Sequence, residues 1–340
     1  MISAKASLMK QKSWHLKYFE SMNVYFDLPN LRSYAKAGGY QNFQSCTNMM
    51  RLNFNIHFCF DKTQLSRERK QSKQSIMTLL KTLTRNRGNS NELVWDETFP
   101  PRPLNANVYD TMNSEQLTSI YFLSDPSVND MVQHGCLLFA KEGDEIKTLS
   151  QLLIEKETIP SRPYSIRTMT DWKVLEDNAT PCTDIIIVDR YIFSQPDILY
   201  PFNSYKIIEH LGRFNHHELN VIIFTDKDTP FKTINSQLKN LLCKRLNLTF
   251  VIIPDGKLKE HDRTIITNYK MFDSGDSFKY FNDKGENQSH GRWLHVNSFG
   301  DKNVRDLSLQ CIKDLQALIN DRKSGLSSII GDKKSLLLKF

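Results

Sequence analysis

The sequence predicts an α/β protein in which a mixed sheet flanked by helices follows a smaller, basic α+β N-terminal domain. Two observations carry this prediction. In the second half of the 340-residue chain, continuous apolar runs of strand length alternate with helical stretches, which is typical of a sheet covered on both faces. Nearer the N-terminus, positive charge is concentrated in one segment.

The strands and helices of the second half follow from hydrophobic patterning. Buried strands are predicted at residues 184–191, 220–225 and 248–254, with helices at 204–211 and 229–246. A later helix, 303–320, should bury Leu307, Cys311, Leu315 and Leu318 along one face. Further strands are expected at 23–27, 54–60, 119–123, 135–140 and 293–296, and a short helix at 146–155.

Turn-forming residues between 88 and 104, among them Gly88 and the Pro100-Pro101 pair, predict a domain boundary there. We therefore expect a basic α+β domain over residues 1–95, an α/β domain over 96–320 and a flexible tail over 321–340. Hydrophobic residues make up 39% of the chain, which excludes a wholly disordered protein.

The basic segment runs from Lys62 to Arg87, and its charge of +7 equals that of the whole chain. Ile76, Leu79, Leu80 and Leu83 recur at helical spacing, so one stripe of a helix should be buried and its charged face exposed. Such a face is either an ordinary solvated surface or a contact to the phosphate backbone of nucleic acid. The candidate nucleic-acid-binding residues are Arg67, Arg69, Lys70, Lys73, Lys81, Arg85 and Arg87.

The stretch 261–269 offers a candidate phosphate site. On a strand His261 and Arg263 point to the same side, where a guanidinium can hold two phosphate oxygens and an imidazole can donate to a third. Asn268 is the third candidate, and a bend near Thr267 is needed to bring it to that side. The alternative is surface charge pairing between Asp262 and Arg263.

The spacing His261-x-Arg263-x-x-x-x-Asn268 resembles a degenerate phospholipase D motif. The closest resemblance is to the non-catalytic C-terminal domain that follows microtubule-interacting-and-transport modules. The strand at 187–191 and the loop at 275–281 match this domain, and the resemblance covers residues 165–285. It implies a phospholipase D-like mixed sheet.

The departures from the active motif favour binding over catalysis. Arg263 stands where the active motif has lysine, Asn268 stands where it has aspartate, and a second complete motif is missing. Phospholipase D chemistry needs one histidine as nucleophile and another as general acid. We therefore predict a phosphate-recognising protein that binds DNA or RNA through an inactive domain, rather than an enzyme.

Two alternatives remain open. A homodimer would bring two copies of His261 together as a metal-independent phosphodiesterase or nuclease, for instance in antiviral defence against foreign nucleic acid. The chain would otherwise be a structural subunit that meets protein partners in a larger nucleoprotein complex.

Asp27 ends the first predicted strand, and Asp27-Leu28-Pro29-Asn30 resembles the opening of PIN-like metal-dependent nuclease domains. In such domains this aspartate helps to hold Mg²⁺. A single aspartate makes no metal site, so we interpret it as a strand end followed by a turn.

We expect no metal and no cofactor. The six cysteines are scattered without a Cys-x-x-Cys pair, and no apolar run is long enough to span a membrane. These features predict a cytoplasmic protein without a membrane span.

Overall fold

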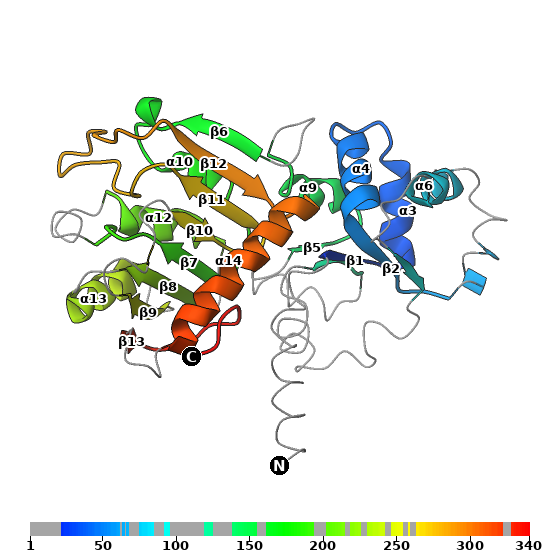
Figure 1. Ribbon diagram of the computed structural model, residues 1–340. Helices are drawn as coiled ribbons and strands as arrows, with labels where there is room; N and C mark the ends of the chain where they lie inside the picture. Colours follow the sequence, from blue (N-terminus) through cyan, green and yellow to red (C-terminus); the bar gives the residue numbers. More distant parts are fainter. Residues whose placement is uncertain are drawn as a thin grey trace, which may run out of the picture. The chain divides into compact units, whose positions relative to one another are not determined.

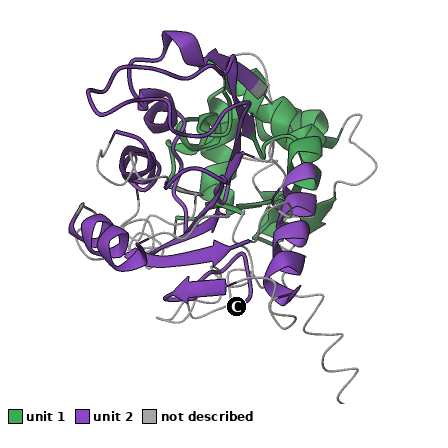
Figure 2. Ribbon diagram, turned by 60° about the vertical axis from the view of Figure 1, so that its left-hand side comes forward, with its two compact units in different colours: residues 1–160, 298–306 green, residues 161–297, 307–340 purple. Residues whose placement is uncertain are grey.

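The computed structural model divides the chain into two compact units, shown in green and purple in Figure 2. Unit 1 holds residues 1–160 and 298–306, and unit 2 holds residues 161–297 and 307–340. The structure describes residues 22–61, 63–64, 66–67, 75–84, 92–95, 119–124, 138–154, 161–193, 202–214, 218–225, 230–241, 246–253, 258, 263–321 and 328–340.

The sheet of unit 1 is parallel, with strand order β3-β2-β1-β4-β5. Its strands are β1 (Met22–Phe26), β2 (Phe54–Phe58), β3 (Leu93–Trp95), β4 (Ile120–Phe122) and β5 (Leu138–Ala140). Its helices are α3 (Leu28–Lys36), α4 (Phe43–Asn53), α6 (Ser75–Thr84) and α9 (Glu145–Ser150). The ring of Phe26 on β1 packs against Tyr34 on α3, with 5.9 Å between their centroids.

Two predictions about this unit are corrected. Parallel pairing needs a crossover between consecutive strands, so the unit is an α/β unit rather than the α+β domain expected for residues 1–95. The boundary expected near residue 95 moves to residue 160, because β4 and β5 pair with β1 in the sheet of unit 1.

Unit 2 contains an eight-stranded mixed sheet of order β13-β9-β8-β7-β10-β11-β12-β6 (Figure 1). The strands are β6 (Ser161–Ser165), β7 (Asp184–Val188), β8 (Leu219–Thr225), β9 (Leu246–Ile252), β10 (Thr264–Ile266), β11 (Lys270–Ser274), β12 (Trp293–Ser298) and β13 (Ser328–Gly331). The helical elements are η1 (Ile166–Thr168), α10 (Lys173–Asp177), α12 (Ser204–Leu211), α13 (Phe231–Leu241) and α14 (Lys302–Asn320).

Helices cover both faces of this sheet, as the sequence predicted. On one face, Ser308 of α14 donates to the Met271 sulfur of β11 at 3.2 Å. On the other face, Phe231 of α13 meets Phe250 of β9 edge to face at 5.3 Å between ring centroids. The parallel strands β7, β8 and β9 lie between these layers. All residues of β7 and β8 are buried, which explains their continuous apolar sequences.

The helix predicted over 303–320 corresponds to α14, but its buried face was predicted only in part. Leu315 is buried as expected, whereas Leu307 is 60% exposed and Cys311 and Leu318 are half-buried. Ser308, Ile312 and Ile319, which were not expected in the core, are buried. Ser308 faces the sheet, so the buried stripe includes a polar position that a pattern of apolar residues does not mark.

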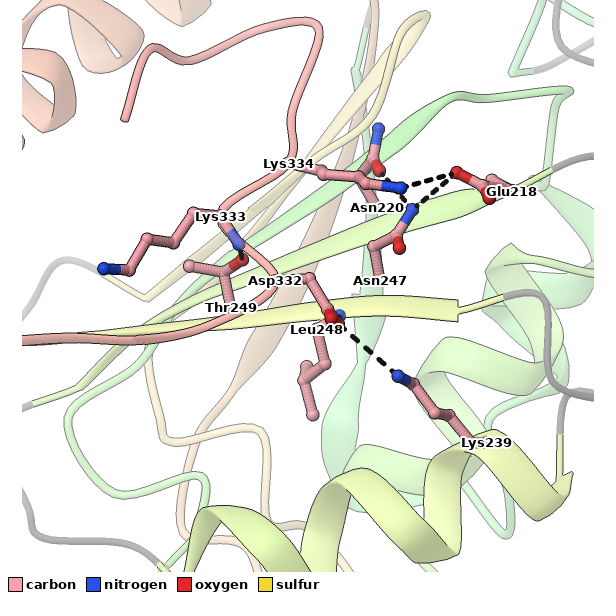
Figure 3. A network of polar contacts seen from close by, with 9 residues as sticks. All are labelled: Glu218, Asn220, Lys239, Asn247, Leu248, Thr249, Asp332, Lys333 and Lys334. Atoms are coloured by element: carbon pink, nitrogen blue, oxygen red, sulfur yellow. Dashed lines mark hydrogen bonds and ion pairs between the residues drawn. The ribbon is translucent and has the colours of Figure 1, made fainter.

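The C-terminal segment, predicted to be a flexible tail over 321–340, contains an ordered strand and an ordered end. Strand β13 pairs antiparallel with β9, and the amide and carboxylate of Asp332 pair with the backbone of Leu248. Figure 3 shows this network, in which Lys239 approaches Asp332 at 3.6 Å and Lys334 donates to Glu218 at 3.2 Å.

The buried carboxylate of Asp184, at the start of β7, fixes the last residues of the chain. It accepts hydrogen bonds from the Ser335 hydroxyl and, at 3.0 Å, from the Leu336 amide. Leu337 and Leu338 are consequently almost fully buried. Among the described residues, no helix is both long enough and apolar enough to span a membrane.

Lys270 is an unusual buried cation at the start of β11, where it is 3% exposed. Its amide donates to the Thr267 hydroxyl at 3.2 Å, which closes the two-residue turn between β10 and β11. Burial lowers the pKa of Lys270 to about 7, because an apolar interior disfavours the ammonium form.

We expect this lysine to make the protein more stable as pH rises above neutrality. Between its lowered folded pKa and its ordinary unfolded pKa, the unfolded chain binds more protons, so the unfolding free energy increases with pH. The limiting slope is about 1.4 kcal/mol per pH unit. Urea denaturation over this range should show that Lys270→Met loses the slope, whereas exposed Lys284→Met keeps it. Equal slopes in all three proteins would contradict the prediction.

Candidate phosphate-binding site

The candidate site is built around Asp189, which directly follows β7 at the carboxyl edge of the parallel strands. Its side chain is fully buried and accepts hydrogen bonds from three donors. The Ser277 hydroxyl lies 2.8 and 3.1 Å from the two carboxylate oxygens, the Phe278 amide donates at 2.7 Å and the Tyr191 amide donates at 2.8 Å. Asp189 thereby fixes the loop that follows β11 onto the end of β7.

Arg263 lies beside Asp189 because of the strand register. Thr264 of β10 pairs with Val188 of β7, so the preceding residue, Arg263, is opposite Asp189. The Nη1 atom of Arg263 donates to the Gly275 carbonyl at 3.0 Å, and the Arg263 carbonyl accepts from the Ser274 amide at 3.0 Å. The guanidinium is therefore oriented by the same loop that Asp189 holds.

The electrostatics of this pair follow from burial. Burial raises the pKa of Asp189, and hydrogen bonds from its three donors together with the Arg263 charge oppose that rise. Tyr280, whose hydroxyl lies 2.6 Å from the Ser274 hydroxyl, also has a raised pKa because it is buried. Arg263 is the partly exposed group of the cluster, so it is the group that an anion would reach.

A second arginine at this edge was not singled out from the sequence. Arg190 follows Asp189, its carbonyl accepts from the Thr225 hydroxyl of β8 at 3.1 Å, and its guanidinium carbon lies 5.4 Å from the centroid of the Tyr191 ring. Ligands of open α/β sheets bind outside the carboxyl ends of the strands. That rule, applied to the end of the 184–191 run, would have pointed to Arg190.

Asn268 does not lie with Arg263, which corrects the predicted grouping. It occupies the turn between β10 and β11, five residues and about 16 Å of extended chain away. Its side chain is fully buried, and its carboxamide oxygen accepts from the Thr183 amide at 2.9 Å. The bend near Thr267 therefore turns Asn268 toward the amino end of β7, where it satisfies backbone groups.

Most of the other predicted site residues fall outside the described part of the chain. These are His261, Arg69, Lys70, Lys73, Arg85 and Arg87. Arg67 and Lys81 are described and exposed. Helix α6 buries Ile76, Leu79 and Leu83 as its spacing predicted, and leaves Lys81 on the exposed side.

Asp27 follows β1, as its interpretation as a strand end predicted, but it caps helix α3 where a turn was expected. Its Oδ1 atom accepts from the amide and the carboxamide of Asn30 at 2.9 and 2.8 Å, and its Oδ2 atom accepts from the Ser124 amide at 2.6 Å. Within the described ranges, His, Cys, Asp and Glu side chains form no cluster that could hold a metal ion.

Comparison with known proteins identifies no family. No protein-family model and no curated protein matches the chain. A solved structure to which the chain is similar is that of TrmBL2, described as "an archaeal chromatin protein" that "shows a novel mode of DNA binding", with 16% identity and a TM-score of 0.26. The match covers 53% of this chain and 59% of that one. A TM-score this low does not establish a shared fold.

We expect Asp189→Asn to loosen the loop at 275–281. The amide keeps the shape of the carboxylate but places an N–H₂ group against the donors that the carboxylate accepts, which leaves buried donors unpaired. The unfolding free energy should fall by about 2–3 kcal/mol, as measured by urea denaturation. Asp283→Asn, an exposed change in the following turn, is the matched control and should stay within about 0.5 kcal/mol of the wild type. Equal stabilities of the two variants would contradict this role of Asp189.

Proposed function

We propose that this protein recognises phosphate groups and binds nucleic acid, with unit 2 as an inactive phospholipase D-like domain. The observation that carries the proposal is the position of Arg263 at the carboxyl edge of β7, oriented through Nη1 by the Gly275 carbonyl. A guanidinium fixed in this way can offer a planar fork to phosphate oxygens.

Two further features support this function. Arg190 lies at the same edge of the sheet, so a second arginine follows the carboxyl end of β7. In unit 1, α6 buries an apolar stripe and leaves Lys81 exposed, where it can contact a phosphate backbone. Arg263 would supply a defined phosphate contact, and the basic segment would supply affinity that is independent of sequence.

Binding is favoured over catalysis because Arg263 and Asn268, the described residues of the candidate motif, lie at opposite ends of β10. The carboxamide oxygen of Asn268 accepts from the Thr183 amide at the opposite end of β10. Asn268 therefore does not contact Arg263. A dimeric nuclease through His261 rests on the sequence motif alone. Cleavage of DNA or RNA in EDTA that disappears in His261→Ala would favour that alternative over an inactive domain.

The phosphate contact is tested with Arg263→Gln in a fluorescence anisotropy titration against labelled DNA and RNA. We expect affinity to fall roughly tenfold to a hundredfold, because charged hydrogen bonds to phosphate are lost. Arg167→Gln removes the same charge from an exposed position of unit 2 and should change affinity by less than about twofold. Equal losses in the two variants would mean that net charge, not this site, determines binding.

The basic segment is tested by the salt dependence of binding. Replacing Arg69, Lys70 and Lys73 by glutamine should reduce the slope of log K against log salt by about 0.9 for each lost contact to duplex phosphate. The control replaces Lys232, Lys284 and Lys313 by glutamine, which removes the same charge from unit 2. An unchanged slope in the first variant would show that the segment is an ordinary solvated surface.

A further inference from the structure

Unit 1 contains a hollow of about 530 Å³ between the end of α3, the loop that leads into α4, and α9. It is separate from Arg263, which belongs to unit 2. A volume of this size falls in the range of small-molecule sites, and it greatly exceeds the space that one inorganic ion needs.

The wall of this hollow is held in place by a buried carboxylate. Glu145, at the start of α9, is 1% exposed and accepts from the Ser33 hydroxyl of α3 at 3.2 Å and from the Gly143 amide at 3.1 Å. Gly143 has a φ of 102°, a conformation that favours glycine. Glu145 therefore holds the start of α9 against α3.

The side chains around the opening are not held in this way. Lys36 of α3 and Lys147 of α9 line the hollow and are exposed. Neither forms a salt bridge with another residue of the described ranges. Tyr40 also lines the hollow, and its side chain is 71% exposed, the largest exposure of any bulky hydrophobic residue that the structure describes.

These groups define the chemistry of a ligand. Lys36, Lys147 and the exposed Glu142 give the opening a net charge of +1, which favours an anion. The accessible aromatic ring of Tyr40 favours a flat partner on which it can stack. The carboxamide of Gln41, also at the hollow, can both donate and accept hydrogen bonds, as the edge of a nucleobase requires. Asn42, which precedes helix α4 and also lines the hollow, makes no capping bond with its side chain, so the positive end of the α4 dipole adds to the attraction for an anion.

We propose that this hollow binds a nucleotide, with the base stacked on Tyr40 and the phosphate held by Lys36 and Lys147. A nucleotide combines a planar ring, hydrogen-bonding edges and an anion in one molecule of suitable size. Unit 1 would then recognise an individual nucleotide in addition to the backbone contacts proposed for its basic segment.

The test is a calorimetric titration of the full chain with adenosine 5′-monophosphate, adenosine and inorganic phosphate. Adenosine 5′-monophosphate should bind more tightly than adenosine or inorganic phosphate does. Tyr40→Ala should weaken that binding about tenfold or more, because base stacking is lost, whereas Tyr40→Phe should keep it. The double variant Lys36→Gln, Lys147→Gln should weaken the nucleotide but not adenosine.

Two controls separate this site from the proposed phosphate site and from folding effects. Trp293→Ala removes another exposed aromatic residue, from unit 2, and should leave nucleotide binding unchanged. Arg263→Gln should also leave it unchanged, so the two proposals can fail independently. The inference is overturned if the wild type does not bind adenosine 5′-monophosphate at about millimolar concentration, or if Tyr40→Ala binds it as well as Tyr40→Phe does.

Discussion

The buried carboxylate of Asp189 is the constraint on which the proposed phosphate site depends. A fully buried acid costs stability unless its oxygens are satisfied, and here the Ser277, Phe278 and Tyr191 groups satisfy them. These bonds connect the loop at 275–281 to the end of β7. Arg263 is oriented by the same loop through Gly275, so its guanidinium is placed by the core of unit 2 rather than by the surface alone.

The sequence predicted the centre of unit 2 well because burial on both faces leaves a continuous apolar run. It predicted the candidate site only in part. The i, i+2 rule can place two side chains on one face of a strand, but it cannot locate the turn that ends the strand. The turn places Asn268 at the amino end of β7, away from Arg263. His261 and most of the basic segment remain predictions.

Unit 1 was harder to predict: the strands expected at 119–123 and 135–140 contain β4 and β5, but no strand was expected at β3, which is only three residues long. Such short runs cannot be told from loops by periodicity. The start of α3 did carry a signal, since Asp27 caps the helix and Pro29 lies in its first turn, a combination typical of helix N-termini. The hollow beside Tyr40 brings together segments about 100 residues apart, which no local pattern encodes.

The central claim, that the carboxyl edge of β7 holds a phosphate, is tested most directly by hydrogen–deuterium exchange of the full chain with and without a saturating oligonucleotide. The account predicts slower exchange in the loop at 275–281 and at residues 190–193, because a phosphate held by Arg263 restrains the loop that orients it. Protection confined to other regions, with exchange of this loop unchanged, would contradict it.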